Sequence, residues 1–290
     1  MGVLIMKKTL TACGMCAIAT LSLLPFAHAT GVPYTIQRAE TGIFLGYGQL
    51  AQNYAETQSG ATLDAETGSI PALTIGASGI SSNPQGGLYW RMSYTHASGS
   101  TNYNGQTLGG TPVQTTTTNT IKEWHARLGE AFGFSRMALI PYFGLGFHNW
   151  VRDVPNSAGG IEHYSDGHMG VGLLGDLALG HHWVIGVHVL EGYTVGAQIQ
   201  ATLPYVLFNL ATGAPVAPVS ATGTYALGDR PYWDVGLKGA YLINHTWQVY
   251  LRVRQTHFAY GASSPNDAGY YEPDSHTTQT LISAGVAAHF

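Results

Sequence analysis

The stretch that decides the fold is Trp247-Gln248-Val249-Tyr250-Leu251-Arg252-Val253-Arg254. Its odd-numbered residues are all apolar, whereas its even-numbered residues include an amide and two guanidinium groups. Successive side chains of a β-strand point to opposite faces, so this stretch predicts a strand with one oil-like face and one cationic face. A helix would mix the two rows on every side.

The same alternation recurs along the chain. Its apolar rows are Trp233, Val235, Leu237, Tyr241 and Ile243; Leu139, Phe143, Leu145 and Phe147; Met169, Val171, Leu173, Leu177 and Leu179; and Ile282, Ala284, Val286, Ala288 and Phe290. Alternating segments of about ten residues are typical of membrane β-barrels, whose strands face lipid on one side and the lumen on the other. Glu130 and Glu191 fall on lipid-facing rows, so we expect each to lie near an interface or to follow a β-bulge.

The composition favours the same class. Only 10% of the 290 residues are charged, whereas 45% are hydrophobic, 11% are aromatic and 38 are glycine. A soluble domain carries about 25% charged residues, and a disordered chain needs low hydrophobicity and high net charge. A soluble β-sandwich also alternates, but its wet face and loops would be rich in charge. No apolar run after residue 30 is long enough for a membrane helix, which leaves a closed all-β barrel.

The N-terminus predicts export. Lys7 and Lys8 precede an apolar stretch, residues 17–24, and Ala27-His28-Ala29 follows as a small-x-small cleavage site. We therefore predict a signal peptide over residues 1–29 and a mature barrel domain over 30–290. Cys13 and Cys16 both fall within the signal peptide, so the mature chain has no thiol. Export without disulfides points to the outer membrane of a Gram-negative bacterium.

Turn signals divide the mature chain into ten strands of an antiparallel up-and-down barrel, with eight or twelve as alternatives. The strands are expected over 42–55, 68–80, 87–98, 119–133, 137–152, 162–179, 183–200, 229–243, 246–261 and 277–290. Short connections alternate with long ones over 56–67, 99–118, 153–161, 201–228 and 262–276. Short periplasmic turns and long outer loops are typical of bacterial outer-membrane barrels. Twelve strands would result if 201–228 formed a hairpin of its own. We expect a monomer.

The C-terminus resembles a known class. The ending Ala284-Gly285-Val286-Ala287-Ala288-His289-Phe290 resembles the signal by which the barrel assembly machinery recognises outer-membrane proteins. Residues 141–146 and 103–106 also look like those of small outer-membrane barrels of the OmpA type or of uncharacterised families. The resemblance implies that Gly285 and Phe290 act as the assembly signal. It also implies outer-membrane lipid, lipopolysaccharide and the assembly machinery as partners.

The inward rows carry both signs of charge. The predicted lumen network comprises Arg91, Glu123, Arg127, Arg152, Asp166, Asp176, Asp234, Lys238, Arg252 and Arg254. A barrel of about eight strands is just filled by its side chains, and unpaired charges there would be very costly. We therefore expect ion pairs that close the lumen, and a structural or surface-interaction role. A narrow, porin-like channel is the alternative. Glycines at 144, 146, 170 and 172 should leave room for long Arg and Tyr side chains.

Two spacings suggest an outer-membrane hydrolase as a further alternative. Asp166-Gly167-His168 places a carboxylate and an imidazole on one face of a strand, near His148 and Arg152, and resembles the Asp-His dyad of the omptin proteases. Omptins also carry an Asp-x-Asp pair, which this chain lacks. Pairing of Asp166 with Arg152 is the favoured interpretation. His96-Ala97-Ser98 matches the His-x-Ser of lipid A deacylases, but ordinary polarity at the barrel rim explains it better.

Other ligand classes have little support. The histidines are scattered and form no HExxH or comparable set, so we expect neither a metal nor another cofactor. Lys7 and Lys8 leave with the signal peptide, so 10 Lys and Arg remain against all 16 Asp and Glu, and we expect no nucleic-acid binding. The weakly charged segments 109–120 and 201–224 are the candidate surfaces for contact with host cells, other bacteria or lipopolysaccharide sugars, and variable coverings without a function are the equal alternative, since loops tolerate sequence change.

Overall fold

The structure is a computed structural model that describes residues 31–81, 86–106, 111–155, 160–208, 215–265 and 271–290, with backbone alone over 203–208 and 215–221. The predicted signal peptide, with Cys13 and Cys16, lies outside the described residues. The elements in chain order are α2 (Tyr34–Glu40), β1 (Gly42–Gln58), β2 (Ala61–Ile80), β3 (Gly87–Gln106), β4 (Pro112–Phe134), β5 (Met137–Asp153), β6 (Ile161–Leu179), β7 (Trp183–Phe208), β8 (Pro215–Ala226), β9 (Pro231–Leu242), β10 (Trp247–Tyr260) and β11 (Asp274–Ala288).

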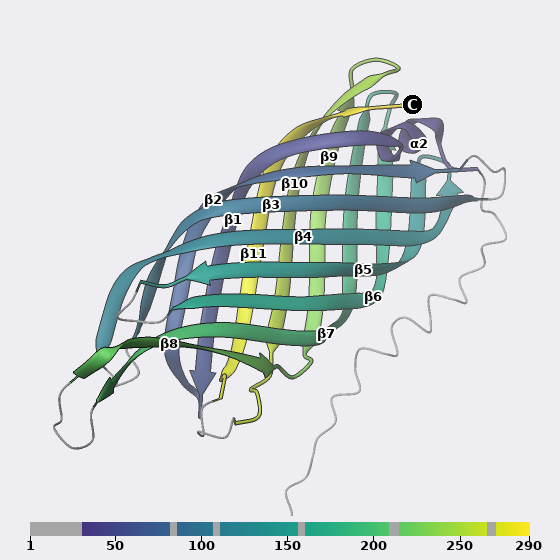
Figure 1. Ribbon diagram of the computed structural model, residues 1–290. Helices are drawn as coiled ribbons and strands as arrows, with labels where there is room; N and C mark the ends of the chain where they lie inside the picture. The colour runs from purple at the N-terminus through teal and green to yellow at the C-terminus, as the bar shows by residue number, and fades with distance from the viewer. Residues whose placement is uncertain (1–30, 82–85, 107–110, 156–159, 209–214, 266–270) are drawn as a thin grey trace, which may run out of the picture.

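Ten of these strands close into an antiparallel barrel (Figure 1). Each strand from β1 to β7 pairs with the next, and β9, β10 and β11 continue the wall from β7 back to β1. The predicted all-β barrel of ten strands is therefore confirmed. Closure matters physically because it leaves no unpaired strand edge within the wall.

The eleventh strand, β8, stands outside this wall. The first half of β7, from Trp183 to Tyr193, pairs with β9, whereas its second half, from Gln198 onward, pairs with β8. The segment 201–228 therefore forms a hairpin, as the twelve-strand alternative required, but the hairpin projects beyond the barrel and adds no strand to the wall. A bulge between the two halves, where Gly196 adopts a φ of +63°, makes this change of partner. Glycine suits that left-handed conformation because it has no Cβ to clash.

The connections at one end of the barrel are short, as predicted, but two of the connections at the other end are shorter than predicted. Of the expected short turns, the structure describes those with Ser135 (φ +56°) between β4 and β5, with Gly180 (φ +75°) between β6 and β7, and between β9 and β10. Residues 82–85 of the expected turn between β2 and β3 lie outside the described residues. The expected long loops over 56–67 and 99–118 are wrong, because β1 and β2 meet at a turn around Ser59 and Gly60, and β3 and β4 stay paired out to Gln106 and Pro112. Threonine-rich segments such as 115–118 favour extended backbone, and strand pairing satisfies their amide groups.

The outer surface carries an apolar band bounded by two aromatic belts. Near the short turns the exposed aromatic residues are Trp183, Trp247 and Phe290, and further along the strands they are Tyr47, Trp124 and Tyr193. Trp183 and Tyr193 are ten residues apart on β7, which corresponds to about 33 Å of strand. At a tilt of about 45° that length spans roughly 23 Å, close to the ~25 Å height of the apolar band of an outer-membrane barrel. The predicted lipid-facing rows lie within this band. The fold is that of a transmembrane β-barrel.

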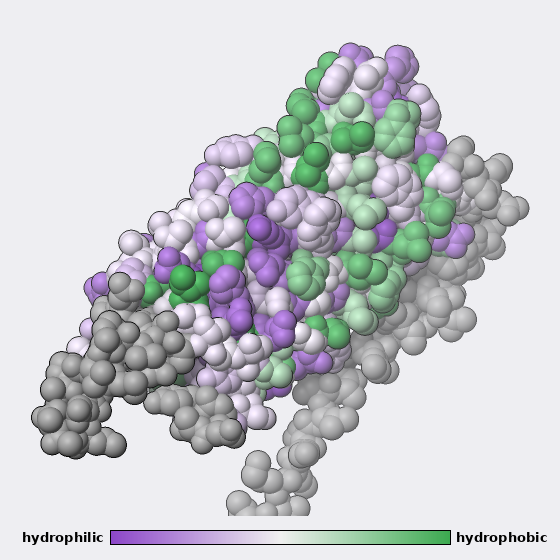
Figure 2. All heavy atoms as spheres, in the orientation of Figure 1, coloured by the Kyte–Doolittle hydropathy of each residue, from purple (hydrophilic) through white to green (hydrophobic). Residues whose placement is uncertain are grey.

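The strands continue well beyond the second belt. There many of their outward side chains are polar, as at Asn53, Ser69 and Lys122. In Figure 2 apolar residues gather on the part of the visible face nearer to α2 and the C-terminus, and polar residues become more frequent toward the other end. We call the end with the short turns the inner end and the end with the β7–β8 hairpin the outer end.

The two carboxylates on lipid-facing rows are placed as expected. Glu130 faces outward close to the inner turn between β4 and β5, and Glu191 faces outward directly opposite Trp233 on β9. Trp233 and Tyr193 lie at the level of the outer aromatic belt, so Glu191 lies near the outer interface. Glu130 lies near the inner interface. A position at mid-membrane would cost more.

The one helix among the described residues closes the inner end of the barrel. Pro33 begins α2, and its carbonyl accepts hydrogen bonds from the amides of Ile36 (2.9 Å) and Gln37 (3.0 Å). Ile36, Ala39 and Glu40 share one face of the helix by their spacing and are all buried. Over the described residues no helix is long and apolar enough to cross a membrane. The sequence analysis did not predict α2.

Candidate functional site

The predicted lumen residues all come from inward rows and occupy three levels along the barrel axis. We call them the outer, middle and inner layers. Each is built around different side chains: Arg152 with four carboxylates, Asp234 with Arg127 and Arg254, and Glu40 of α2 with Lys238 and Arg91. In each layer the contacts join strands that are distant in the wall, so the layers cross the lumen.

The outer layer surrounds Arg152 with carboxylates. The guanidinium donates from Nε to Glu66 (2.9 Å), from Nη2 to Asp64 (3.1 Å) and from Nη1 to Glu162 (2.8 Å) and Glu56 (3.4 Å). Its side chain is only 1% exposed. Such multiple charge-assisted hydrogen bonds are what a buried guanidinium needs to offset its lost hydration.

A stack of aromatic rings lies beneath this arginine. Tyr54 meets Trp150 edge to face at a centroid distance of 5.1 Å, and the stacked pairs Trp150–Tyr164 and Tyr164–Tyr260 have centroid distances of 5.0 and 5.8 Å. The rings come from β1, β5, β6 and β10 and are fully or almost fully buried. The stack therefore fills the lumen from one wall to the opposite one.

A carboxylate outside the strands completes the outer layer. Glu272, in the connection between β10 and β11, accepts a hydrogen bond from the Tyr164 hydroxyl at 3.0 Å. Burial and the neighbouring Glu162 raise the pKa of Glu272 to about 8. The outer layer thus holds more carboxyl groups than its single arginine can neutralise.

The expected pair of Asp166 with Arg152 is wrong. Asp166 instead accepts hydrogen bonds from the Tyr260 hydroxyl (2.5 Å) and from Nδ1 of His148 (3.1 Å). The reason is distance along the strands, since Arg152 lies opposite Glu162, four residues further out than the partner of Asp166, which is His148. Arg152 therefore reaches the outer carboxylates of β1 and β2.

The residues of the proposed dyad are close but enclosed. Nδ1 of His168 lies 3.9 Å from Asp166, and Nε2 of His168 lies 3.1 Å from Nδ1 of His125. The His168 ring also stacks on Tyr232 at a centroid distance of 4.3 Å. Asp166 is 2% exposed and His168 is 5% exposed, so neither has an open side for a polymeric substrate. The geometry supports a structural network more than an active site.

The middle layer centres on Asp234. Its carboxylate is bound by Arg254, by Arg127 at 3.3 Å and by Nε2 of His188 at 2.6 Å. Arg254 also donates to Glu123 at 3.1 Å and to Nε2 of His125 at 2.8 Å. Because Glu123 and Arg127 lie on β4 whereas Asp234 lies on β9 and Arg254 on β10, these ion pairs cross the lumen.

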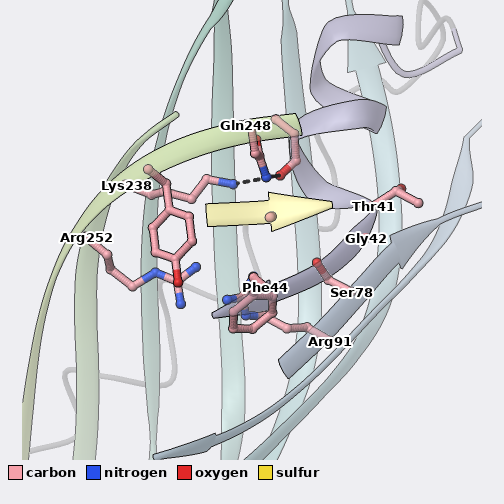
Figure 3. Close-up of a pocket in the computed structure, with 11 residues that line it drawn as sticks. Thr41, Gly42, Phe44, Ser78, Arg91, Lys238, Gln248 and Arg252 are labelled. Carbon is pink, nitrogen blue, oxygen red and sulfur yellow. Dashed lines mark hydrogen bonds between the residues drawn. The ribbon is translucent and has the colours of Figure 1, made fainter. Parts of the chain in front are cut away.

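The inner layer joins the barrel wall to α2. Lys238 binds the carboxylate of Glu40 and donates to the Ala39 carbonyl at 3.2 Å, and Gln248 donates to the same carbonyl at 3.2 Å. Nη1 of Arg91 lies 3.8 Å from the second oxygen of Glu40. Figure 3 shows Lys238, Arg252 and Arg91 directed toward the same space below the helix.

Two predicted members of the network lack the expected partner. Arg252 has no carboxylate within 4 Å in the described part of the chain, and its guanidinium lies over the rings of Phe44 (5.7 Å) and Tyr250 (5.6 Å). Neither oxygen of Asp176 has a hydrogen-bond partner there. The expectation of complete charge pairing is therefore wrong for this pair, since their strands hold them at a separation too large for contact.

Glycines on the inward rows make room for large side chains. A Cβ on Gly172 would lie 2.4 Å from the ring of Tyr142, one on Gly146 would lie 2.2 Å from His168, and one on Gly144 would lie 2.3 Å from Leu190. The predicted role of these positions is correct for tyrosine, although histidine and leucine take the places expected for arginine.

The C-terminal residues also have a packing role. Gly285 faces the lumen on β11, where a Cβ would lie 2.5 Å from the Tyr250 ring and 2.3 Å from the Leu45 carbonyl oxygen. Phe290 is exposed at the inner aromatic belt. Their role as an assembly signal stays a prediction, but Gly285 is required by close packing whatever recognises it.

Substituting Gly285 with valine should destabilise the folded barrel by about 1–3 kcal/mol, because the side chain would displace Tyr250 and press on the β1 backbone. Gly239 on β9 is the matched control, since a Cβ there meets no atom within 4 Å. Guanidinium unfolding of both Gly→Val variants in detergent micelles, starting from purified refolded protein, measures packing apart from assembly in cells. Equal stability of the two variants would contradict this account of Gly285.

The second candidate spacing lies on the outer surface, whereas part of the candidate surface segment 109–120 faces the lumen, where Asn119 is buried and donates to Glu66 at 2.6 Å. His96 and Ser98 face outward on β3, and the Ser98 hydroxyl is 3.3 Å from that of Thr120. Residues 111–120 belong to the start of β4 or lead into it, and residues 107–110 lie outside the described ones. Among the described residues no carboxylate forms a hydrogen bond with His96. The structure therefore does not support the deacylase interpretation.

The sequence analysis missed the acidic half of two layers. Glu56, Asp64 and Glu66 were placed in an outer loop, and Glu40 precedes the first predicted strand. Glu162 could have been found, since it shares the inward parity of Asp166 on the same predicted strand. The others could have been found only by extending the alternation of β1 and β2 beyond the membrane.

Comparisons with known proteins found no match by sequence and several similar structures. No protein-family model matches it, and no curated protein matches it. Among solved structures it is similar to the outer membrane protease OmpT from Escherichia coli, with 9% identity, 87% of this chain and 97% of that chain covered, and a TM-score of 0.48. The Pseudomonas putida toluene transporter TodX is 12% identical, with 89% of this chain and 92% of that chain covered and a TM-score of 0.30. Ail of Yersinia pestis is 10% identical, with 86% of this chain and 99% of that chain covered and a TM-score of 0.29. The assignment of the barrel rests on the strand pairing and apolar band of this chain.

Proposed function

We propose that the chain is an integral outer-membrane protein of a Gram-negative bacterium, exported by a cleaved signal peptide, whose barrel is closed and non-conducting. The observation that carries the proposal is the filling of the lumen at three successive levels. The outer layer with its aromatic stack, the middle layer around Asp234 and the inner layer under α2 each bridge the barrel. A water path would have to pass all three.

The remaining role is structural or consists of contact at the cell surface. The strands extend beyond the outer aromatic belt, and the β1–β2, β3–β4 and β7–β8 hairpins form the exposed outer end. No charged residue lies between Glu191 and Asp229. Such an uncharged hairpin suits contact with lipopolysaccharide sugars or another surface better than binding of a charged ligand. Outer-membrane lipid and the barrel assembly machinery are the other proposed partners.

A channel would be revealed by conductance. We expect purified, refolded barrel in planar bilayers to give no steady conductance steps, because side chains from opposite walls occlude the lumen. Heat-modifiable gel migration verifies that the inserted protein is folded, and an open porin reconstituted in parallel verifies the recording. Steady, reproducible steps from the folded wild-type protein would overturn the closed barrel.

The hydrolase alternative has less support. Asp166 and His168 are buried in the lumen, and both are engaged by neighbouring side chains. Catalysis would require an opening of the outer layer that the contacts around Arg152 oppose. Turnover of peptide or lipid A substrates by wild-type protein, abolished in His168→Ala, would favour the enzyme.

A further inference from the structure

Two adjoining cavities lie between α2 and the middle layer. The first lies against Thr41, Phe44 and Ser78, as Figure 3 shows. The second is the larger of the two and extends toward Arg127, His188 and Arg254. Arg91, Lys238 and Arg252 line both cavities. The shared boundary of the two cavities is therefore made of three cationic side chains.

The carboxylates near these cations do not neutralise them. The Glu40 carboxylate forms a direct ion pair with Lys238, but its second oxygen lies 3.8 Å from Nη1 of Arg91. Nη2 of Arg91 has no hydrogen-bond partner among the described residues, and Arg252 has no carboxylate within 4 Å there. Asp176 is the other acidic group facing this region, and it contacts none of the three. An excess of positive charge therefore faces the cavities.

This arrangement is costly unless something else binds there. Arg91 is 7% exposed and Lys238 is 8% exposed, so solvent screens them little. Burying an unpaired charge costs several kcal/mol, which an anion held by the same groups would offset. Cation–π contacts of Arg91 and Arg252 with Phe44 hold both guanidinium groups at the cavity, but they supply no negative charge.

We infer that the cavities below α2 form a binding site for a small oxyanion of the phosphate class, held by Arg91, Arg252 and Lys238. Guanidinium groups present parallel N–H donors that match the oxygens of a phosphate, and an ammonium adds a point charge. Ser78 and Gln248 line the first cavity and supply neutral polar groups. The barrel wall and α2 border the site, and three cationic side chains line it, which favours a small free anion over a lipid with acyl chains. The site does not depend on the closed-barrel proposal.

Inorganic phosphate is the probe. Full-length mature protein is refolded in neutral detergent with sodium phosphate or with sodium chloride at equal ionic strength, and the thermal unfolding midpoint is measured. A ligand that binds only the folded state raises the midpoint as its concentration rises. We expect phosphate, and not chloride, to raise the midpoint of the wild-type protein.

Arg252→Gln tests the assigned residues, and Arg136→Gln, in the exposed turn between β4 and β5, is the matched control. We expect Arg252→Gln to weaken phosphate binding about tenfold or more, since a charged hydrogen-bond donor is lost. In chloride the same variant should be no less stable than the wild type, because it removes an unpaired buried charge. Arg252→Lys, which keeps the charge, gives a second variant if the first does not fold. Absence of a phosphate effect in the wild type, or an equal effect in Arg252→Gln and Arg136→Gln, would overturn the site.

Discussion

Arg152→Met should lower the free energy of unfolding by about 3–5 kcal/mol, the cost of leaving buried charges without their partner. Four carboxylates, on Glu56, Asp64, Glu66 and Glu162, share this one guanidinium. Without it they repel one another in an enclosed volume. Methionine keeps much of the length of the arginine side chain, so lost packing contributes little. Guanidinium unfolding of the refolded protein in micelles at pH 7 measures the change.

The loss in Arg152→Met should shrink as the pH falls. With the arginine gone, the crowded carboxylates of the folded state take up protons more readily than those of the unfolded chain. Stability therefore rises as protons are added, in the sense required by linkage. The matched control is Arg230→Met, which removes an exposed arginine 3.0 Å from Asp274 and should cost no more than about 1 kcal/mol. If the two variants lose the same stability, or if acid does not restore Arg152→Met, the outer layer does not depend on its arginine.

Asp234→Leu should have an effect of similar size, about 3–5 kcal/mol, for the opposite reason. The carboxylate forms ion pairs with Arg127 and Arg254 and contacts His188. Its removal leaves two arginines on facing walls with only Glu123 to neutralise them. The ladder that crosses the middle of the lumen would then be broken at its centre. The same unfolding experiment applies.

A second substitution separates charge from packing in the middle layer. Adding Arg127→Met to Asp234→Leu restores the balance, because Arg254 keeps its contact with Glu123 at 3.1 Å. We expect the double variant to recover part of the lost stability, a non-additivity that neighbouring charges show and distant ones do not. A double variant less stable than Asp234→Leu alone would show that packing, rather than charge balance, governs this layer.

These layers explain why the sequence predicted which charged residues face the lumen but not which of them form ion pairs. Alternation assigns Arg152, Asp166 and Arg254 to the inward rows without any structure, because side-chain direction has a period of two. Which inward groups meet depends on strand register and on which strands face each other across the barrel. Asp166 therefore meets His148 and Tyr260 rather than the expected Arg152.

The sequence by itself determined the class of fold. Local patterning sufficed for the barrel, for the ten strands of its wall and for the outward rows, since each depends only on neighbouring residues and on the lipid that must solvate them. Only the tertiary structure decided that the strands of the outer end stay paired beyond the membrane, that α2 enters the lumen, and that Arg252 lacks a carboxylate. Those features depend on contacts between residues far apart in the chain, such as Glu40 with Lys238 and Arg152 with Glu66, and no local period encodes them.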